Sequence, residues 1–346
     1  MHYCRPDEVI VISVTYGNRT EMLERMARSV SAEGVRQIFV FGNGLSEEAK
    51  RATRSLAGRL DADFGVVMIL SGSPQNLGSA AGYASLLAAT ERASNMRAVW
   101  FLDDDNAPEP GCLTQLLKAL AITEGAAVSA VRRDRIYMMN AVSGGEVTFP
   151  ASGEVFGRDV RRTAKRALLK LSLSKSARKS PGRHLDVPVA FPRVPYGGLL
   201  IPAGLTRDVA PPREDFVLYA DDYEYSCRLS KAKGLYIVPK AYICDSEPSW
   251  NANSAEKIQH SQLTRMALMP PNFRLFFALR NAIYLDRRRT SINTWPWFVV
   301  NLAWLLADFS VRAIVRGRFG NLSTVFSAAW SGVLGKLGAH PRYPLP

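Results

Sequence analysis

The chain has 346 residues, and its 47% hydrophobic content excludes general disorder. Its formal net charge is +13, so it needs an anionic surface or an anionic substrate, for which nucleic acid and acidic lipid headgroups are the generic partners. The length allows a sizeable core, and we expect one large domain with an appendage.

The four cysteines lie at positions 4, 112, 227 and 244, far apart and without metal-type spacing. We interpret them as buried thiols of a reducing compartment. The first apolar run, at 9–15, follows charged residues and is too short and too β-branched for a signal peptide. The sequence therefore predicts a cytoplasmic protein.

The first part of the chain alternates predicted strands with predicted helices. Runs typical of buried strands lie at 9–15, 38–41, 66–70, 99–102 and 126–131. Helical patterns lie between them, and we expect Asn18 and Glu21 to form a capping box and Ser46 to begin the next helix. This alternation predicts an α/β fold with a mostly parallel sheet and helices on both faces.

The alternation ends at about residue 132. Residues 142–158 have the turn-rich composition of a hairpin, and 158–183 are strongly basic. The basic stretch is either a mobile, solvated loop or a contact with anionic headgroups or a polyanionic acceptor. We expect regular structure to resume near residue 194.

Three carboxylates, Asp103, Asp104 and Asp105, follow the predicted strand at 99–102. Side chains alternate along an extended backbone, so Asp103 and Asp105 share one face and Asp104 takes the other. The pair suits one hard cation, Mg²⁺ or Mn²⁺, because no His or Cys lies nearby to complete a zinc site. The carboxyl end of a strand is also where an α/β sheet binds ligands. The alternative is a solvated acidic turn.

A second pair of carboxylates, Asp221 and Asp222, begins a helical pattern that continues through Leu229. The positive end of a helix dipole favours an ionised carboxylate there. Such an Asp can accept a proton from a substrate hydroxyl as a general base, although ordinary N-capping is the alternative.

Residues 295–315 form the most apolar stretch, in which Asn301, Asp308 and Arg312 fall on one narrow stripe of a helix. The apolar arc opposite suits a helix that lies in a membrane interface or packs on another helix. A membrane span is less favoured, because three polar residues in such a helix are costly in hydrocarbon.

Six motifs occur in a fixed order. They are TYGNR at 15–19, NG at 43–44, NLGSAAG at 76–82, FLDDDNAPEPG at 101–111, YGGLLIP at 196–202 and ADDYEYSCRLSKAKG at 220–234. This order resembles glycosyltransferase family 2, most closely the galactofuranosyltransferases of bacterial cell-wall assembly and then related rhamnosyltransferases. The likeness covers about residues 9–250, with a further match at Leu279-Arg280-Asn281.

The resemblance implies a GT-A catalytic domain at 1–250 and a helical, membrane-associating region at 251–346. It implies an inverting transferase that uses Mn²⁺ or Mg²⁺ and takes a sugar from a nucleotide-diphosphate donor, UDP-galactofuranose before dTDP-rhamnose. The implied acceptor is a lipid-linked or cell-surface glycan, at the anionic inner face of the cell membrane. No nucleic acid is an implied partner.

The resemblance also implies roles for individual residues. Asp103 and Asp105 would hold the metal, with Asp245 at the position of a metal-binding His, and an Asp remains an acceptable ligand for a hard cation. Asp222 would be the catalytic base and Asp221 its neighbour near the acceptor. The residues with implied donor contacts are Thr15, Arg19, Asn43, Asn76, Gly78, Asp103 and Asp104. Gly197 and Gly198 replace paired aromatic residues beside the acceptor, which suggests a roomier pocket.

Three other functions stay open. A nucleotidyltransferase also places carboxylates and metal near a diphosphate, although it usually has a Gly-rich signature and a Lys where this chain has residues 15–19. A nucleic-acid-binding or membrane-binding protein without catalysis would fit the charge, but no recognisable RNA or DNA motif is present. A scaffold that binds a donor without turnover is the third alternative.

Overall fold

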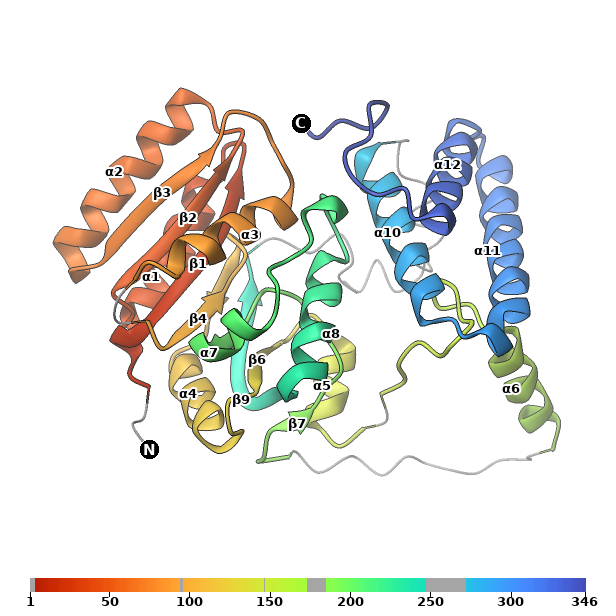
Figure 1. Ribbon diagram of the computed structural model, residues 1–346, viewed down its shortest axis with the longest axis horizontal. Coiled ribbons are helices and arrows are strands. Elements are labelled where there is room, and N and C mark those ends of the chain that lie inside the picture. The colour runs from red at the N-terminus through yellow and green to blue at the C-terminus, as the bar shows by residue number, and fades with distance from the viewer. Residues whose placement is uncertain (1–3, 94–95, 146, 173–184, 247–271) are drawn as a thin grey trace.

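The computed structural model describes residues 4–93, 96–145, 147–172, 185–246 and 272–346. A sheet flanked by helices forms one part of the molecule, and helices from the C-terminal end of the chain form the other (Figure 1).

Within the described residues, nine strands form one sheet in the order β3-β2-β1-β4-β8-β6-β9-β5, with β7 beside β9. Their bounds are β1 Val9–Tyr16, β2 Gln37–Asn43, β3 Val67–Ser73, β4 Ala98–Phe101, β5 Asn106–Pro108, β6 Ala127–Arg132, β7 Val189–Ala190, β8 Leu199–Pro202 and β9 Leu235–Asp245. β1 to β4 pair in parallel, as do β6 and β9, whereas β8 runs antiparallel to β4 and β6. The predicted α/β fold class is confirmed.

The helices alternate with these strands and then continue alone. Their bounds are α1 Thr20–Ala32, α2 Glu47–Phe64, α3 Ser79–Thr90, α4 Cys112–Ile122, α5 Ile136–Val142, α6 Val160–Ser172, α7 Ala203–Asp208, α8 Asp221–Lys233, α10 Phe273–Arg289, α11 Trp295–Val315 and α12 Gly320–Leu334. Short 3-10 turns lie at Pro6–Glu8, Glu214–Phe216 and Ile292–Thr294.

The central strands are buried on both faces, which explains their continuous apolar runs. Along β1, Val9 and Val11 pack into one core with α1, α2 and α4. Ile10 and Ile12 point the other way, into a second core with α3 and α8. Because neighbouring side chains alternate across a strand, one apolar run serves both layers.

The start of α2 is as predicted, because the Ser46 hydroxyl accepts a hydrogen bond from the Ala49 N–H at 3.1 Å. The predicted capping box of Asn18 and Glu21 is wrong. Helix α1 begins at Thr20, and the capping residue Arg19 has no side-chain cap bond. The Arg19 guanidinium can only donate, so it cannot accept the cap hydrogen bond, and it reaches the aspartates after β4 instead.

The turn-rich stretch after β6 does not form the predicted hairpin. Helix α5 ends at Val142, where the stretch begins, and beyond it the described residues form one isolated bridge, between Val155 and Arg158. The basic stretch forms helix α6 over its first half, so it is not a loop there, and residues 173–184 lie outside the described residues. Its strong amphipathicity favours a helix over the expected solvated coil.

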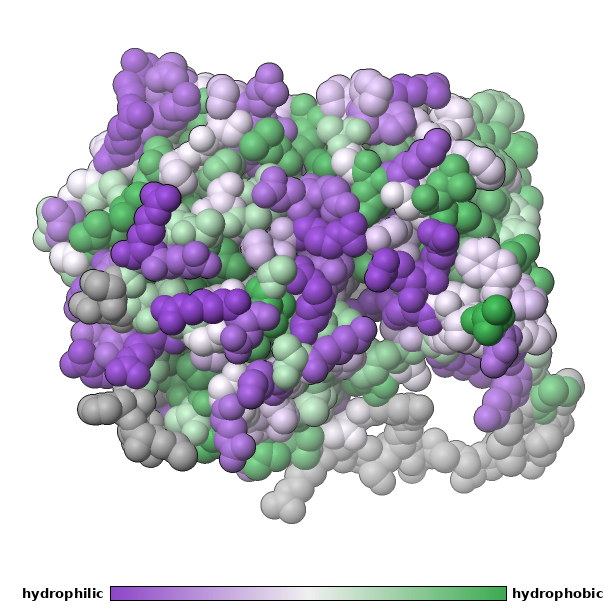
Figure 2. All heavy atoms as spheres, viewed as in Figure 1, coloured by the Kyte–Doolittle hydropathy of each residue, from purple (hydrophilic) through white to green (hydrophobic). Residues whose placement is uncertain are grey.

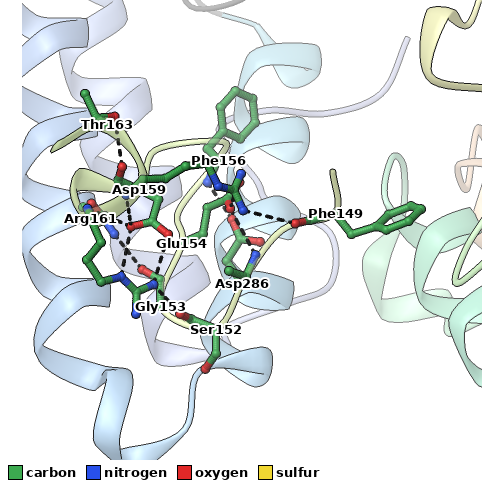
Figure 3. Close-up of polar contacts among 12 residues, drawn as sticks. Phe149, Ser152, Gly153, Glu154, Phe156, Asp159, Arg161, Thr163 and Asp286 are labelled. Carbon is green, nitrogen blue, oxygen red and sulfur yellow. Dashed lines mark hydrogen bonds and ion pairs between the residues drawn. The ribbon is translucent and has the colours of Figure 1, made fainter. Parts of the chain in front are cut away.

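The segment 149–163 leaves the sheet and packs against the C-terminal helices (Figure 3). The Phe156 N–H donates to Asp286 Oδ2 on α10 at 2.7 Å, and Arg161 donates to the Ser152 carbonyl at 2.8 Å. Val155 is fully buried in a third core, which the C-terminal helices supply. The helical part therefore draws on sequence from before residue 251.

Helix α11 coincides with the predicted 295–315. The polar stripe faces the protein, because Asn301 Nδ2 donates to the Gly153 carbonyl at 2.8 Å and Asp308 pairs with Arg158 and Arg312. The apolar arc opposite is left largely exposed. By length and composition α11 is also the one helix within the described residues that could cross a membrane.

All four cysteines are free thiols, as predicted, but only Cys112 is buried and Cys244 is exposed.

Candidate active site

The three aspartates follow the carboxyl end of β4, which pairs in parallel with β1. Asp104 points toward β1, where it accepts hydrogen bonds from the Thr15 hydroxyl at 2.7 Å and from Arg19 Nε at 2.8 Å. Thr15 is almost fully buried, and its hydroxyl donates its hydrogen bond to Asp104. In this structure Thr15 and Asp104 therefore hold Arg19 and the aspartate turn in place.

Asp103 and Asp105 face the cleft. Asp103 accepts hydrogen bonds from the Tyr83 hydroxyl at 3.1 Å and from Arg132 Nη1 at 3.2 Å. Asp105 Oδ1 accepts from Asn106 Nδ2 at 3.1 Å, while Asp105 Oδ2 lies 3.6 Å from Arg19 Nη2. Asp105 Oδ2 is thus the least engaged of these four carboxylate oxygens.

Asp245, at the end of β9, reaches the same cluster. It accepts a hydrogen bond from Asn106 at 3.0 Å and forms an ion pair with Arg132. The Arg132 guanidinium is buried and also contacts Asp103, so it lies between the two aspartates. The sequence analysis missed Arg132, whose signal was an arginine at the carboxyl end of a strand.

The aspartate cluster fits a hard divalent cation bound by two carboxylates. Burial, followed by the charges of Asp103 and Asp245, raises the pKa of Asp105, which indicates a local surplus of negative charge. No three His, Cys, Asp or Glu side chains converge on a possible metal position within the described residues. Magnesium-type ions are commonly held by one or two carboxylates and by substrate phosphates, so a site made of Asp103 and Asp105 alone is compatible with this chemistry. The pairing of Asp245 with Arg132 gives no support to a third ligand there.

Gly197 makes room for this cluster rather than for an acceptor. A Cβ at Gly197 would lie 2.1 Å from Asn106 Oδ1 and 2.9 Å from Arg132 Nη1. The space beside Gly197 is filled by Asn106 and Arg132, so this glycine does not itself open room for an acceptor.

The loop before α3 closes another side of the cleft. Asn43 is buried at the end of β2, where its amide donates to the Gly78 carbonyl at 2.8 Å and accepts from the Leu77 N–H at 2.7 Å. Gly78 has a φ of +87°, and a Cβ there would lie 2.0 Å from the Val217 carbonyl oxygen. Asn43 thus shapes the loop, and Asn76 and Gly78 line the cleft.

The second pair of carboxylates begins α8, as predicted. Asp221 is buried and accepts a hydrogen bond from the Ser79 hydroxyl at 3.0 Å. Asp222 is half-buried and accepts from the Tyr223 N–H at 2.8 Å. Burial raises the pKa of both carboxyl groups, and the charge of Asp222 adds to the rise at Asp221. Asp222 is therefore the more accessible base of the two.

One cleft of about 1360 Å³ joins these groups. Of the residues predicted for the site, the cleft is lined by Arg19, Asn43, Asn76, Gly78, Asp103, Asp104, Asp105, Asp221, Asp222 and Asp245, and Thr15 is absent from the lining. The charge of Asp103 contributes to the raised pKa of Asp222, which places the two carboxylate groups within electrostatic reach. Helix α10 forms the opposite wall with Arg274, Asp286 and Arg289, which the sequence analysis did not identify.

No protein-family model and no curated protein matches the chain. Among solved structures, it is similar to the mannosyltransferase PcManGT from Pyrobaculum calidifontis in complex with GDP-Man and Mn²⁺, with a TM-score of 0.50, 15% identity, and coverage of 96% of this chain and 89% of that one. S. aureus TarS 1-349 in complex with UDP matches at a TM-score of 0.45 and 12% identity over 94% and 91% of the two chains, which is too weak to support an inference.

The chain thus has a GT-A-like fold, followed by C-terminal helices. The fold places the carboxyl ends of β1, β2 and β4 at one edge, where Arg19, Asn43 and the aspartate turn meet. That edge is where this class of α/β sheet binds ligands.

Proposed function

We propose that the protein is an inverting glycosyltransferase that takes a sugar from a nucleotide-diphosphate donor. The observation that carries the proposal is the shared cleft, which is lined both by the carboxylates of Asp103 and Asp105 and by a separate carboxylate, Asp222. Such a pair of sites is what transfer from a diphosphate to a hydroxyl requires. The cleft volume lies above the usual range for one small ligand, which leaves room for a donor and an acceptor.

Donor binding would use the side of the cleft near β1 and β4. Asp103 and Asp105 would hold Mg²⁺ or Mn²⁺, which when bound supplies positive charge to the leaving diphosphate. Arg19 adds a guanidinium beside the same carboxylates, and Arg132 adds a second, permanently charged one. These fixed charges stabilise the departing phosphate without reorganisation.

The acceptor hydroxyl would be activated by Asp222. A carboxylate with a raised pKa is a stronger base than an ordinary Asp, and it stays ionised only above that pKa. Asp222 takes the hydroxyl proton as the hydroxyl oxygen forms its bond to the anomeric carbon and the bond to the diphosphate breaks. A single displacement of this kind inverts the configuration at that carbon.

The acceptor would be presented at an anionic membrane surface. Figure 2 shows hydrophobic side chains along the edge of the molecule at which α11 and α12 lie. The exposed large apolar residues there are Trp295, Trp297, Val299, Val300, Val311, Ile314, Val315, Phe319, Phe326, Trp330 and Leu334. An apolar face with aromatic members and neighbouring arginines is typical of interfacial helices. It supports a peripheral position that brings a lipid-linked glycan to the cleft.

The deciding experiment is a thermal-shift titration with nucleotide sugars in the presence of Mn²⁺. The panel contains UDP-galactofuranose, dTDP-rhamnose and GDP-mannose, with Mn²⁺ alone, a nucleoside triphosphate with a sugar phosphate, and an oligonucleotide as comparisons. We expect one nucleotide sugar to raise Tm by about 5 °C at a hundredfold excess over its Kd. Stabilisation by the oligonucleotide, or by the triphosphate alone, would contradict the proposal.

A further inference from the structure

The loop that leads into the base-carrying helix has an unusual backbone. Val217, Tyr219 and Ala220 have φ angles of +66°, +68° and +62°, and none of them is glycine. Val217, with ψ of −66°, forms a γ-turn closed by a 2.8 Å hydrogen bond from the Leu218 N–H to the Phe216 carbonyl. This turn is rare and strained, especially for a β-branched residue. Something must hold the loop in this shape.

Asn281, on α10, is the residue that holds it. The Asn281 amide nitrogen lies 2.9 Å from each of three backbone carbonyl oxygens, those of Phe216, Leu218 and Tyr219. Its two N–H groups serve all three acceptors, so one N–H is shared between two carbonyls. Asn281 is fully buried, so water cannot replace these bonds. One amide group therefore gathers the carbonyls of the strained turn.

Arg280 fixes the orientation of that amide. Arg280 Nε donates to Asn281 Oδ1 at 2.8 Å, and because a guanidinium can only donate, the amide nitrogen must face the loop. Arg280 Nη2 also donates to the Phe216 carbonyl at 3.0 Å, and Nη1 donates to the Gly338 carbonyl at 2.5 Å. Arg280 and Asn281 both belong to the Leu279-Arg280-Asn281 motif, to which the proposed mechanism assigns no other role.

The held loop connects directly to both halves of the site. Ala220 is the capping residue of α8, so the φ of the loop sets where Asp222 points. On its other side the Val217 carbonyl accepts a hydrogen bond from the Ala80 N–H at 3.3 Å, at the start of α3 beside Gly78. Only Ala220 and Asp221 separate Asp222 from Tyr219, whose carbonyl Asn281 bonds. A change at Asn281 would therefore alter the position of Asp222.

We propose that Asn281, oriented by Arg280, is a positioning residue that keeps the 216–220 loop strained so that Asp222 is aimed at the acceptor side of the cleft. The inference rests on the proposed function, because it assigns Asp222 as the base. Loss of the Asn281 amide releases the loop toward ordinary backbone angles and rotates the start of α8. Misplacement of a catalytic group by about 1 Å costs about 100-fold in rate.

The test compares Asn281→Asp with Asn301→Asp. Asn301 is a matched control, because it is also fully buried in a C-terminal helix and also bonds the backbone, at Gly153 and Val160. Hydrogen exchange followed by mass spectrometry on the ligand-free full chain is the first readout. We expect faster exchange in the peptide that covers 214–224 for Asn281→Asp and unchanged exchange there for Asn301→Asp.

The second readout is kinetic and uses the nucleotide sugar that gives the largest shift in the thermal panel. We expect kcat per folded molecule to fall about 100-fold in Asn281→Asp, with the donor KM changed less than about threefold, and to be nearly unchanged in Asn301→Asp. If Asn281→Asp does not fold, Arg280→Lys, which retains the charge and loses the oriented fork, serves for the same two readouts.

Unchanged hydrogen exchange at 214–224 in the Asn281 variant would overturn the proposal that Asn281 holds the 216–220 loop, whatever the protein's activity is. Faster exchange with a kcat equal to that of the Asn301 control would overturn the positioning role. If no nucleotide sugar stabilises or reacts with the wild-type chain, the proposed function fails instead, and the exchange result still decides whether Asn281 holds the loop.

Discussion

At the scale of single residues, the two acids at the start of α8 are chemically alike but differently placed. Both line the cleft, but Asp221 is buried and accepts a hydrogen bond from Ser79, whereas Asp222 is half-buried. Because two adjacent carboxylates repel each other, burial favours one negative charge on the pair. Position, rather than residue type, therefore distinguishes the proposed base from its neighbour.

Asp222→Asn is expected to lower kcat by about 10²- to 10⁴-fold and to leave donor affinity nearly intact, because the amide cannot take the hydroxyl proton. In the wild type, the rate should rise with pH through the raised pKa of Asp222, so the acid limb lies above the ordinary carboxylate value of about 4. A steady-state pH profile and a donor titration measure both. Near-normal turnover of the variant would remove Asp222 from the mechanism.

The metal proposal predicts different effects on Mn²⁺ affinity for substitutions at Asp105 and at Asp245. Asp105→Ala removes a ligand and is expected to weaken Mn²⁺ binding by at least about 100-fold. Asp245→Asn, which acts indirectly through its contacts with Arg132 and Asn106, is expected to cost about tenfold. Mn²⁺ titration followed by electron paramagnetic resonance gives both affinities. Glu109→Gln, which removes the partner of the exposed Arg133, is the control for a simple loss of charge. A larger loss at Asp245 than at Asp105 would make Asp245 a direct ligand.

At the scale of elements, α11 buries apolar residues together with Asn301 and leaves further apolar residues exposed. Asn301 is buried because it satisfies the backbone of the 153–160 segment, while Val311 and Ile314 are exposed. A monomeric soluble protein rarely leaves such a continuous apolar surface uncovered. The arrangement favours an interfacial helix over one packed in the core.

The double variant Val311→Ser with Ile314→Ser is therefore expected to bind anionic vesicles at least about tenfold more weakly, with little change in Tm, because both side chains are already exposed. Co-sedimentation with phosphatidylserine-containing vesicles measures the affinity. Ile122→Ser, at an equally exposed apolar residue on α4, is the control and should leave binding unchanged. Equal losses in both proteins would argue against a membrane-facing role for α11.

At the scale of the whole molecule, the cleft belongs to both parts of the chain. The sheet supplies the aspartates and Arg132, and α10 supplies the opposite wall. The 149–163 segment packs among the C-terminal helices (Figure 3). Asn281 on α10 donates a hydrogen bond to the Phe216 carbonyl in the loop before α8. The expected boundary at residue 250 divides the chain in sequence, but residues from both sides of it line the cleft.

The sequence by itself determined the features that depend on local chemistry. Continuous apolar runs gave the strands that became β1 to β4 and β6, Ser46 set the start of α2, and the 295–315 pattern gave α11. The acids at 103–105 were identifiable because they end an apolar strand, and those at 221–222 because they begin a helical pattern. Each of these patterns depends only on residues close together in the sequence, so it can be recognised without knowledge of the fold.

Only the tertiary structure decided which groups meet. Arg132 lies between Asp103 and Asp245, Gly197 makes room for Asn106, and Asn281 holds a loop more than sixty residues earlier in the chain. Arg19 serves the aspartates rather than a helix cap for the same reason. The partners of a buried charge or amide are set by packing between distant segments, and no local pattern in the sequence records that choice.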